Sequence, residues 1–256
     1  MGIKRILITS LVCFLAVSLF AGYFYHVGTF AAAKGREVAC SKVNVHILDS
    51  LESSAIERGD VRKMLDTALV GKKIDSIDLS LIERRILSHG EIRTSKVYIS
   101  PGGALNVAVT QRKPVARFEN PTERYYSDEY GYLFPVSKHI EVPVVTGSIP
   151  LSRGSDFKGY TSSEEALWIN GIISFIQETG KDPYWKKHIQ QIDIGSNGDI
   201  LLYLDCGAEK IIFGDCRNIV SKLKKLRAYY ENIAPRHEAN TFSTVNLKYK
   251  NQIICK

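Results

Sequence analysis

The sequence lacks the motifs of the common enzyme classes. It contains no Gly-x-Ser-x-Gly elbow, no His-Glu-x-x-His, no P-loop and no Gly-x-Gly-x-x-Gly. Its six histidines are spread along the chain without the spacing of metal ligands. The sequence therefore predicts a protein that is not an enzyme, with no catalytic residues and no cofactor, metal or small-molecule substrate.

The chain also lacks a dense run of basic residues. It has 34 Lys and Arg against 27 Asp and Glu, which gives a formal net charge of +7. This mild excess permits attraction to anionic lipid or to an acidic protein, but it predicts no binding to nucleic acid. With 45% hydrophobic and 24% charged residues over 256 positions, the composition is that of packed domains, one large or two small.

Long apolar runs are absent except near the N-terminus, where Ile6–Tyr25 carries no charge. Because roughly 20 apolar residues suffice to cross a bilayer, we expect residues 1–33 to form a short cytoplasmic tail and a transmembrane helix. Lys4 and Arg5 favour a cytoplasmic N-terminus. The alternative is a signal peptide cleaved within Phe30–Gly35, but a signal peptide has an apolar core of only about 7–15 residues.

Cysteines are few, five in all, and Cys13 lies in the expected span. The other four would face an oxidising compartment and permit three full pairings: Cys40, Cys206, Cys216 and Cys255. Cys206 and Cys216 are expected to lie in one hairpin, in which Cys206 is opposite Ile211. Cys216 then lies opposite Leu201, roughly 17 Å away along the strands. A disulfide requires Cα atoms within about 7 Å, so we expect no Cys206–Cys216 bond and buried free thiols instead.

Residues 38–113 show the order strand, helix, helix, strand, strand. Alternating or helically spaced apolar residues, with a Pro-Gly-Gly turn between the last two strands, mark these five segments: Lys42–Leu48, Gly59–Gly71, Ser80–Gly90, Thr94–Ser100 and Ala104–Arg112. Two helices on one face of a three-stranded sheet make a compact domain of about 70 residues.

Residues 115–256 are expected to form a second, mixed α+β domain with an antiparallel sheet. Ser162 and Glu165 form a capping box at the start of a long helix, and Asn197-Gly198 suits a tight hairpin turn. The last segment, Thr244–Lys256, reads TVNLKYKNQIICK and is predicted to be one strand. The fold class of the whole chain is therefore α+β.

Three further segments carry a family resemblance. Gln111–Phe118 reads QRKPVARF, in which an Arg, one residue and Pro-Val-Ala follow one another. Tyr125–Ser137 contains an Asp, two residues and a Gly before an apolar strand, and Val142–Gly147 is a short apolar strand. These segments follow a single span and a domain whose order of elements is similar to that of a POTRA domain. With them, nearly the whole chain resembles the bacterial cell-division family FtsQ/DivIB.

The segment QRKPVARF is predicted to be a joint between the two domains. Pro114 has a fixed φ and no N–H, so it ends the ladder of the strand before it and makes the connection stiff. We assign the joint to Arg112, Lys113 and Pro114. Arg112 and Lys113 are expected to be solvated, without a carboxylate partner.

The resemblance implies a scaffold of the division septum. A protein of this family would bind partners of the FtsB and FtsL type through its membrane-distal domain and would act indirectly on the septal cell-wall synthases. It would be a single-pass inner-membrane protein with a cytoplasmic N-terminus and periplasmic domains, located at the septum. A membrane-anchored extracytoplasmic hydrolase acting on the cell wall is the alternative. A third possibility, an assembly or secretion factor with a POTRA domain, would carry repeated POTRA units or a membrane barrel, and neither is visible in the sequence.

The last strand is the expected docking edge. In the family, the corresponding region receives a strand from FtsB, so the resemblance implies partner binding here: Asn246, Leu247, Lys248, Tyr249 and Lys250. Addition of a strand to a sheet edge uses backbone hydrogen bonds for affinity and side chains for specificity. Val245 and Leu247 are expected to face the core.

Overall fold

The structure is a computed structural model that describes residues 14–29, 38–49, 56–65, 68–135, 138–154, 156–238 and 241–256. The chain divides into two compact units. Unit 1 comprises Met1–Leu48, Glu57–Ser88 and Thr94–Thr110, and unit 2 comprises the remaining segments, Asp49–Ile56, His89–Arg93 and Gln111–Lys256.

Residues 14–29 form a helix whose large apolar side chains are exposed. The predicted span begins at Ile6, and residues 6–13 lie outside the described part of the chain. Within the described residues, no helix combines the length and the apolar character that crossing a bilayer requires.

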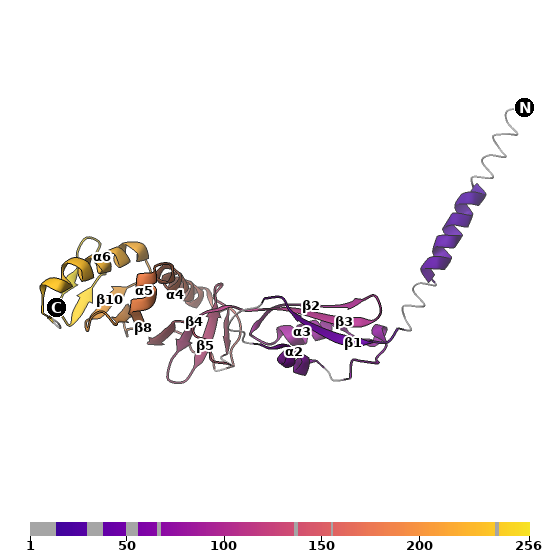
Figure 1. The fold of residues 1–256 in the computed structure, drawn as a ribbon, viewed down its shortest axis with the longest axis horizontal. Helices are drawn as coiled ribbons and strands as arrows, with labels where there is room; N and C mark the ends of the chain where they lie inside the picture. The colour runs from indigo at the N-terminus through magenta and orange to yellow at the C-terminus, as the bar shows by residue number, and fades with distance from the viewer. Residues whose placement is uncertain are drawn as a thin grey trace, which may run out of the picture. The chain divides into compact units, whose positions relative to one another are not determined.

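Unit 1 has the predicted order of strand, helix, helix, strand and strand, with a short 3-10 helix between the two α-helices (Figure 1). The elements are β1 (Lys42–Ile47), α2 (Arg58–Met64), η1 (Ile74–Ser76), α3 (Leu79–Leu87), β2 (Ile92–Ser100) and β3 (Ala104–Gln111). The helix predicted over Gly59–Gly71 is shorter than expected, because extended backbone at Leu65 ends α2.

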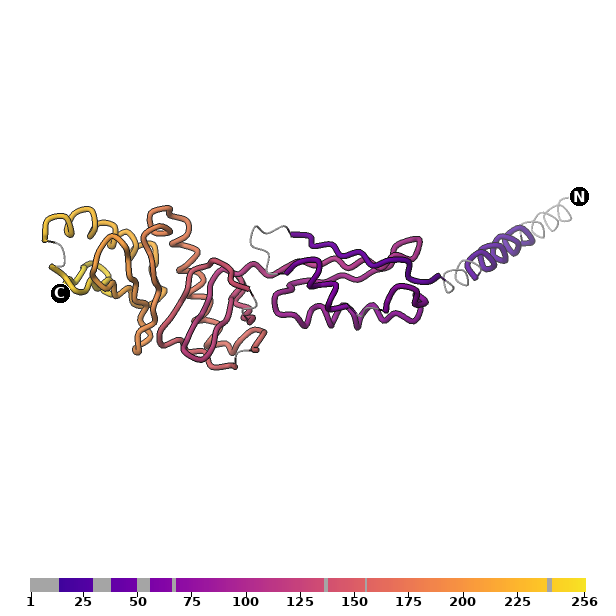
Figure 2. Tube along the Cα trace, turned by 60° about the horizontal axis from the view of Figure 1, so that its bottom comes forward, coloured from indigo at the N-terminus to yellow at the C-terminus, as the bar shows by residue number. Residues whose placement is uncertain are grey.

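The sheet of unit 1 has the order β1-β3-β2, so the last strand in sequence lies in the middle. β1 pairs with β3 in parallel, with Val45 opposite Val107. Both valines are buried, as are Val61 of α2 and Ile86 of α3. Figure 2 shows the helices on one side of the strands, and the core of the unit lies between these two layers.

In its described residues, unit 2 contains one large sheet and three α-helices. Its elements are β4 (Pro114–Glu119), β5 (Arg124–Asp128), β6 (Leu133–Pro135), β7 (Val144–Gly147), α4 (Ser163–Lys181), α5 (Pro183–His188), β8 (Ile189–Ile194), β9 (Ile200–Leu204), β10 (Lys210–Gly214), α6 (Ile219–Asn232), η2 (Ala234–Arg236), β11 (Thr244–Asn246) and β12 (Ile254–Cys255).

The nine strands of this sheet follow the order β12-β11-β10-β9-β8-β7-β4-β5-β6. The prediction of an antiparallel sheet is wrong in part, because β7 pairs in parallel with both β4 and β8, and β10 pairs in parallel with β11. A parallel pair needs a crossover connection, and here long segments supply it: α4 and α5 lie between β7 and β8, and α6 lies between β10 and β11.

The core of unit 2 lies between the sheet and its helices. Ile172 and Phe175 of α4 and Leu226 of α6 pack in one cluster with strand residues that include Phe118 and Phe213. The rings of Phe175 and Phe213 meet edge to face, with centroids 4.9 Å apart. At 0% to 1% exposure these five side chains have lost nearly all contact with water, and full burial of a side chain of this size stabilises a fold by about 1.5–3 kcal/mol.

The β9–β10 hairpin has a different register from the predicted one. Ile211 lies opposite Leu202, so Cys206 belongs to the connecting turn and has no partner strand residue. Four cysteines of the described chain are free thiols, and Cys206 is exposed rather than buried. Cys216 is half-buried, and burial raises the pKa of its thiol to about 11.

Candidate functional site at the C-terminal sheet edge

The C-terminal segment forms two short strands instead of the one predicted. β11 ends at Asn246, the chain turns, and it returns as β12, which pairs antiparallel with β11. The turn begins where the Asn246 side chain accepts a hydrogen bond from the Lys248 N–H at 3.0 Å, a local bond that competes with the ladder. Two short apolar stretches separated by residues 248–252, four of which are polar, were the signal for this hairpin in the sequence.

The inner side of β11 is fully engaged with the sheet. Val245 lies opposite Ile211 in the parallel pair with β10, and the Leu247 N–H donates to the Ile212 carbonyl at 2.9 Å. Val245 and Leu247 are both fully buried, as the alternation predicted. β11 is therefore an interior strand of the sheet.

The five predicted docking residues have different environments. Asn246 lies in β11, Leu247 lies in the core, and Lys248, Tyr249 and Lys250 are exposed in the turn that follows. Tyr249 keeps 49% of its surface exposed, which makes it the large apolar side chain of this segment that faces solvent. The alternation that would have buried Tyr249 does not continue past Leu247, because β11 ends at Asn246.

Two lysines hold this turn in place. Lys248 Nζ lies 2.7 Å from Asp199 Oδ2, and this hydrogen bond raises the pKa of Lys248. Lys225 of α6 donates from its Nζ to the carbonyl of Leu247 at 2.9 Å and to that of Tyr249. Burial and the neighbouring Lys222 lower the pKa of Lys225. The turn that presents Tyr249 is therefore fixed by contacts to the body of the unit.

The outer edge of β12 presents backbone groups away from the sheet. Thr244 and Lys256 form a doubly hydrogen-bonded pair, with both N–H to O distances at 3.0 Å. In an antiparallel ladder the next residue belongs to the non-hydrogen-bonded pair, so the N–H and C=O of Cys255 point away from β11. The C=O of Ile253 points the same way, because it belongs to the same trans peptide as the Ile254 N–H, which faces β11.

The opposite edge of the sheet differs from this one. There, Leu133 of β6 exchanges two backbone hydrogen bonds with Gly159, at 3.0 and 2.9 Å. These bonds cover part of the β6 edge, which natural sheets commonly need to prevent unwanted pairing. Among the described residues, no corresponding pair of backbone hydrogen bonds covers the edge of β12.

The predicted joint is part of unit 2, and one expectation about it is wrong. Arg112 is not solvated: its Nη1 donates to Asp128 Oδ2 at 2.7 Å, and the two side chains are only 11% and 3% exposed. Its guanidinium also lies over the ring of Tyr132, 3.4 Å from the ring centre. Lys113 is exposed as expected, and Pro114 is the first residue of β4. The sequence could not reveal this ion pair because its partners are 16 positions apart.

Among the described residues, one group of potential metal ligands is close together, His188 with Asp205 and Cys206. These side chains belong to the same unit as the β12 edge but to different elements, α5 and the turn after β9.

The comparisons with known proteins agree with this architecture. Residues 113–256 match the family model described as FtsQ/DivIB, C-terminal related, and residues 38–110 match the model of a POTRA-like domain. The first match covers unit 2 from the joint to the C-terminus, including the β12 edge. No curated protein matches the chain.

Proposed function

The chain belongs to the FtsQ/DivIB, C-terminal related family, which points to a role in cell division, and from this premise we propose that it is a divisome scaffold. In this role it binds partners of the FtsB and FtsL type and links them to the enzymes of septal peptidoglycan synthesis. It performs no chemistry of its own, as is typical of this family of non-catalytic scaffolds.

The outer edge of β12 is the observation that carries this proposal. A partner strand placed beside β12 would form two hydrogen bonds with Cys255 and one with the carbonyl of Ile253. At about 1 kcal/mol net for each bond, they contribute about 3 kcal/mol. Micromolar affinity requires about 8 kcal/mol, so side-chain contacts must supply about 5 kcal/mol more.

Two exposed features beside β12 are suited to supply them. Tyr249 offers a large aromatic ring at the turn, and aromatic anchors dominate the energetics of many interfaces. Lys250, also exposed, would meet an acidic group of the partner at the rim. We therefore keep Asn246–Lys250 as the proposed partner-binding segment, with Tyr249 as its anchor. The backbone hydrogen bonds to the partner strand are now assigned to β12.

The test separates backbone from side chain at one position. Cys255→Pro removes an N–H that points away from β11, so the sheet keeps its own bonds. Cys255→Ala removes the same thiol and keeps the N–H. With the full chain in detergent and the extracytoplasmic part of an FtsB-type partner, we expect Cys255→Pro to weaken binding about tenfold and Cys255→Ala to leave it within twofold.

The result that contradicts strand addition is equal binding by the two variants. A loss of binding in Cys255→Pro accompanied by a matching loss of thermal stability contradicts it as well. Ile254→Pro serves as the positive control for misfolding, because the Ile254 N–H faces β11 and its loss breaks the ladder.

We also propose that the N-terminal segment anchors the protein in the inner membrane as a single span with the two units in the periplasm. The exposed apolar side chains of residues 14–29 support this, since they require an apolar environment. External protease added to spheroplasts should digest both units and leave the N-terminus protected. Release of a soluble form that begins near residue 34 would contradict the anchor.

The proposed domain limits, 38–113 and 115–256, are tested by expressing the two fragments separately. Each should unfold cooperatively on its own, because each contains a sheet and the helices that bury it. If neither fragment folds, the proposed boundary is wrong.

The hydrolase alternative gains no support from the one described group that contains a thiol, an imidazole and a carboxylate. A nucleophilic cysteine needs a lowered pKa, whereas partial desolvation of the sulfur raises the pKa of the Cys206 thiol, although the residue as a whole is exposed. Depletion in the native cell distinguishes the two functions, since loss of a scaffold produces filaments without septa and loss of a hydrolase leaves septation intact.

A further inference from the structure

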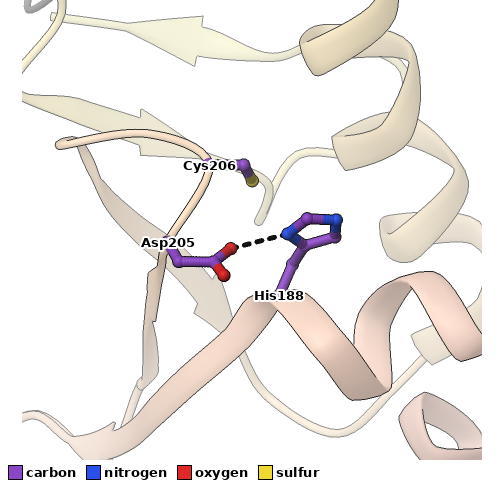
Figure 3. A group of neighbouring side chains, drawn as sticks. All are labelled: His188, Asp205 and Cys206. Carbon is purple, nitrogen blue, oxygen red and sulfur yellow. Dashed lines mark hydrogen bonds and ion pairs between the residues drawn. The ribbon is translucent and has the colours of Figure 1, made fainter.

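Three side chains with metal-binding atoms converge at the end of the β8–β9 ladder (Figure 3). His188 is the last residue of α5, and Asp205 and Cys206 follow the last residue of β9. One imidazole nitrogen, one carboxylate oxygen and one sulfur all lie within 4.8 Å of one another. Neither the family assignment nor the scaffold function uses these side chains.

The main chain holds two of these residues opposite each other. The Asp205 N–H donates to the His188 carbonyl at 3.1 Å, which extends the pair of Ile189 with Leu204 by one step. The Nδ1 atom of His188 lies 2.6 Å from Asp205 Oδ1. The sheet therefore positions both side chains independently of any ion, which is the preorganisation that a binding site needs.

The turn after β9 brings the sulfur to the same side. In a continuous strand, consecutive side chains point to opposite faces, but Asp205 and Cys206 lie in a turn, where this alternation ends. Figure 3 shows the sulfur of Cys206 on the same side of the imidazole ring as the Nδ1 atom, which contacts Asp205. The imidazole nitrogen, the carboxylate and the sulfur thus surround one point. In a catalytic triad, by contrast, the carboxylate contacts one nitrogen of the ring and the thiol contacts the other.

We propose that His188, Asp205 and Cys206 bind a divalent transition metal of the zinc class, with water in the fourth position. Imidazole, thiolate and carboxylate are the ligands of zinc sites, and three protein ligands with one open position are a common set. Zinc bonds of about 2.0–2.3 Å at tetrahedral angles place ligand atoms about 3.3–3.7 Å apart, which the present separations reach after shifts of roughly 1 Å.

The surroundings allow a cation to enter and remain. The side chains of His188 and Asp205 are 20% and 43% exposed, so the site is open to solvent. The ring of Tyr184 packs on the imidazole, with centroids 4.4 Å apart, and limits its rotation. Arg227 lies over Tyr184, but its charge is offset by Asp182, 3.0 Å away, so it adds little repulsion to the site.

The competing explanation is an ordinary ion pair between His188 and Asp205 beside an unrelated thiol. The two explanations differ in the sulfur. A metal bound at this point displaces the thiol proton to the buffer and forms a metal–sulfur bond, whereas the ion pair leaves Cys206 protonated. Cobalt(II) reports this directly, because a sulfur ligand gives a charge-transfer band in the near ultraviolet and tetrahedral coordination gives intense visible bands.

The experiment uses the full chain in detergent, reduced and stripped of metal with a chelator. Addition of cobalt(II) should produce both sets of bands at one equivalent, and zinc(II) should then abolish them. Cys206→Ser should lose the sulfur band and bind at least tenfold more weakly. The matched control is Cys255→Ser, which alters another thiol of the same unit and should leave the spectrum and the affinity unchanged.

The proposal is overturned by a wild-type chain without a sulfur band, by an equal band in Cys206→Ser, or by loss of the band in Cys255→Ser. Circular dichroism verifies that each variant is folded. If Cys206→Ser fails to fold, Asp205→Asn takes its place, because the amide keeps a hydrogen bond to His188 without the charge. Asp205→Asn should bind at least tenfold more weakly and keep the sulfur band, and an unchanged affinity overturns the proposal.

Discussion

Replacing Arg112 by alanine should lower the free energy of unfolding of unit 2 by about 3 kcal/mol. The guanidinium and the Asp128 carboxylate form a pair at 2.7 Å in which Asp128 is 3% exposed. Removal of one partner of a buried ion pair costs about 3–5 kcal/mol, because the other charge remains buried without compensation. The lower end of this range applies here, since the N–H groups of Tyr130 and Tyr132 still donate to Asp128 Oδ1 at 3.0 Å each.

Fluorescence measures this change selectively. The two tryptophans of the chain, Trp168 and Trp185, both belong to unit 2, so urea unfolding followed by indole emission reports that unit. Lys113→Ala is the matched control, because this neighbouring side chain is exposed and its loss should change the free energy by less than about 0.5 kcal/mol.

A double-mutant cycle attributes the loss to the pair. In the background of Arg112→Ala, the further change Asp128→Asn removes the uncompensated charge, so the double variant should be more stable than the sum of the single effects by about 1–2 kcal/mol. Equal urea midpoints for Arg112→Ala and Lys113→Ala, or a coupling energy of zero, would refute the reasoning.

Three other variants address the backbone, a helix cap and acid stability. Gly147→Ala should destabilise unit 2 by about 3 kcal/mol or more, because φ is +90° and the new Cβ would lie 2.3 Å from a carbonyl oxygen. The control is Gly198→Ala, where φ is +81° and the space around the new Cβ is open, and it should cost about 1 kcal/mol in the same urea assay. Ser162→Ala removes one half of the capping box of α4 and should cost about 1 kcal/mol by thermal melting, and an unchanged melting temperature would show that the cap is dispensable. Burial raises the pKa of Asp215, but hydrogen bonds from Lys222 and its other partners outweigh burial and hold that pKa well below its usual range. The folded-state pKa is therefore depressed, so its stabilisation is complete above the unfolded value of about 3.9 and is lost as the pH falls below it. Asp215→Asn should accordingly flatten the decline in stability on the acid side of pH 4, and a decline as steep as in the wild type would contradict this assignment.

Features that depend on a few neighbouring residues could be predicted from the sequence. The capping box of Ser162 and Glu165 is confirmed, with both reciprocal bonds formed. Gly198 has φ of +81° in the turn predicted at Asn197-Gly198. The order of elements in unit 1 is also confirmed. It could be predicted because the spacing of apolar residues within each segment indicates a helix or a strand.

The neighbour relations of the strands could not be predicted in this way. Alternation in a strand identifies the face that is buried, but it carries no information on which strand lies beside it. β7, with only four residues, therefore gave no sign that it would pair in parallel with both β4 and β8. The partner-binding segment Asn246–Lys250 stays a prediction. Its geometry depends on where β11 ends, and the hydrogen bond that the Asn246 side chain accepts from the Lys248 N–H marks that point.

The order of the strands also bears on how this sheet forms during synthesis. From β7 to β12 each new strand joins the one made before it, while β4, β5 and β6 form a local group at the other end. Such a sheet can grow as successive segments enter the compartment in which unit 2 folds, since each pairing requires only segments that have already arrived. The growing edge is always the most recent strand, and β12 is the last of the series. A partner strand that docks on β12 would occupy the tenth position of the sheet, so assembly of the complex would repeat, between two polypeptides, the step by which the fold was built.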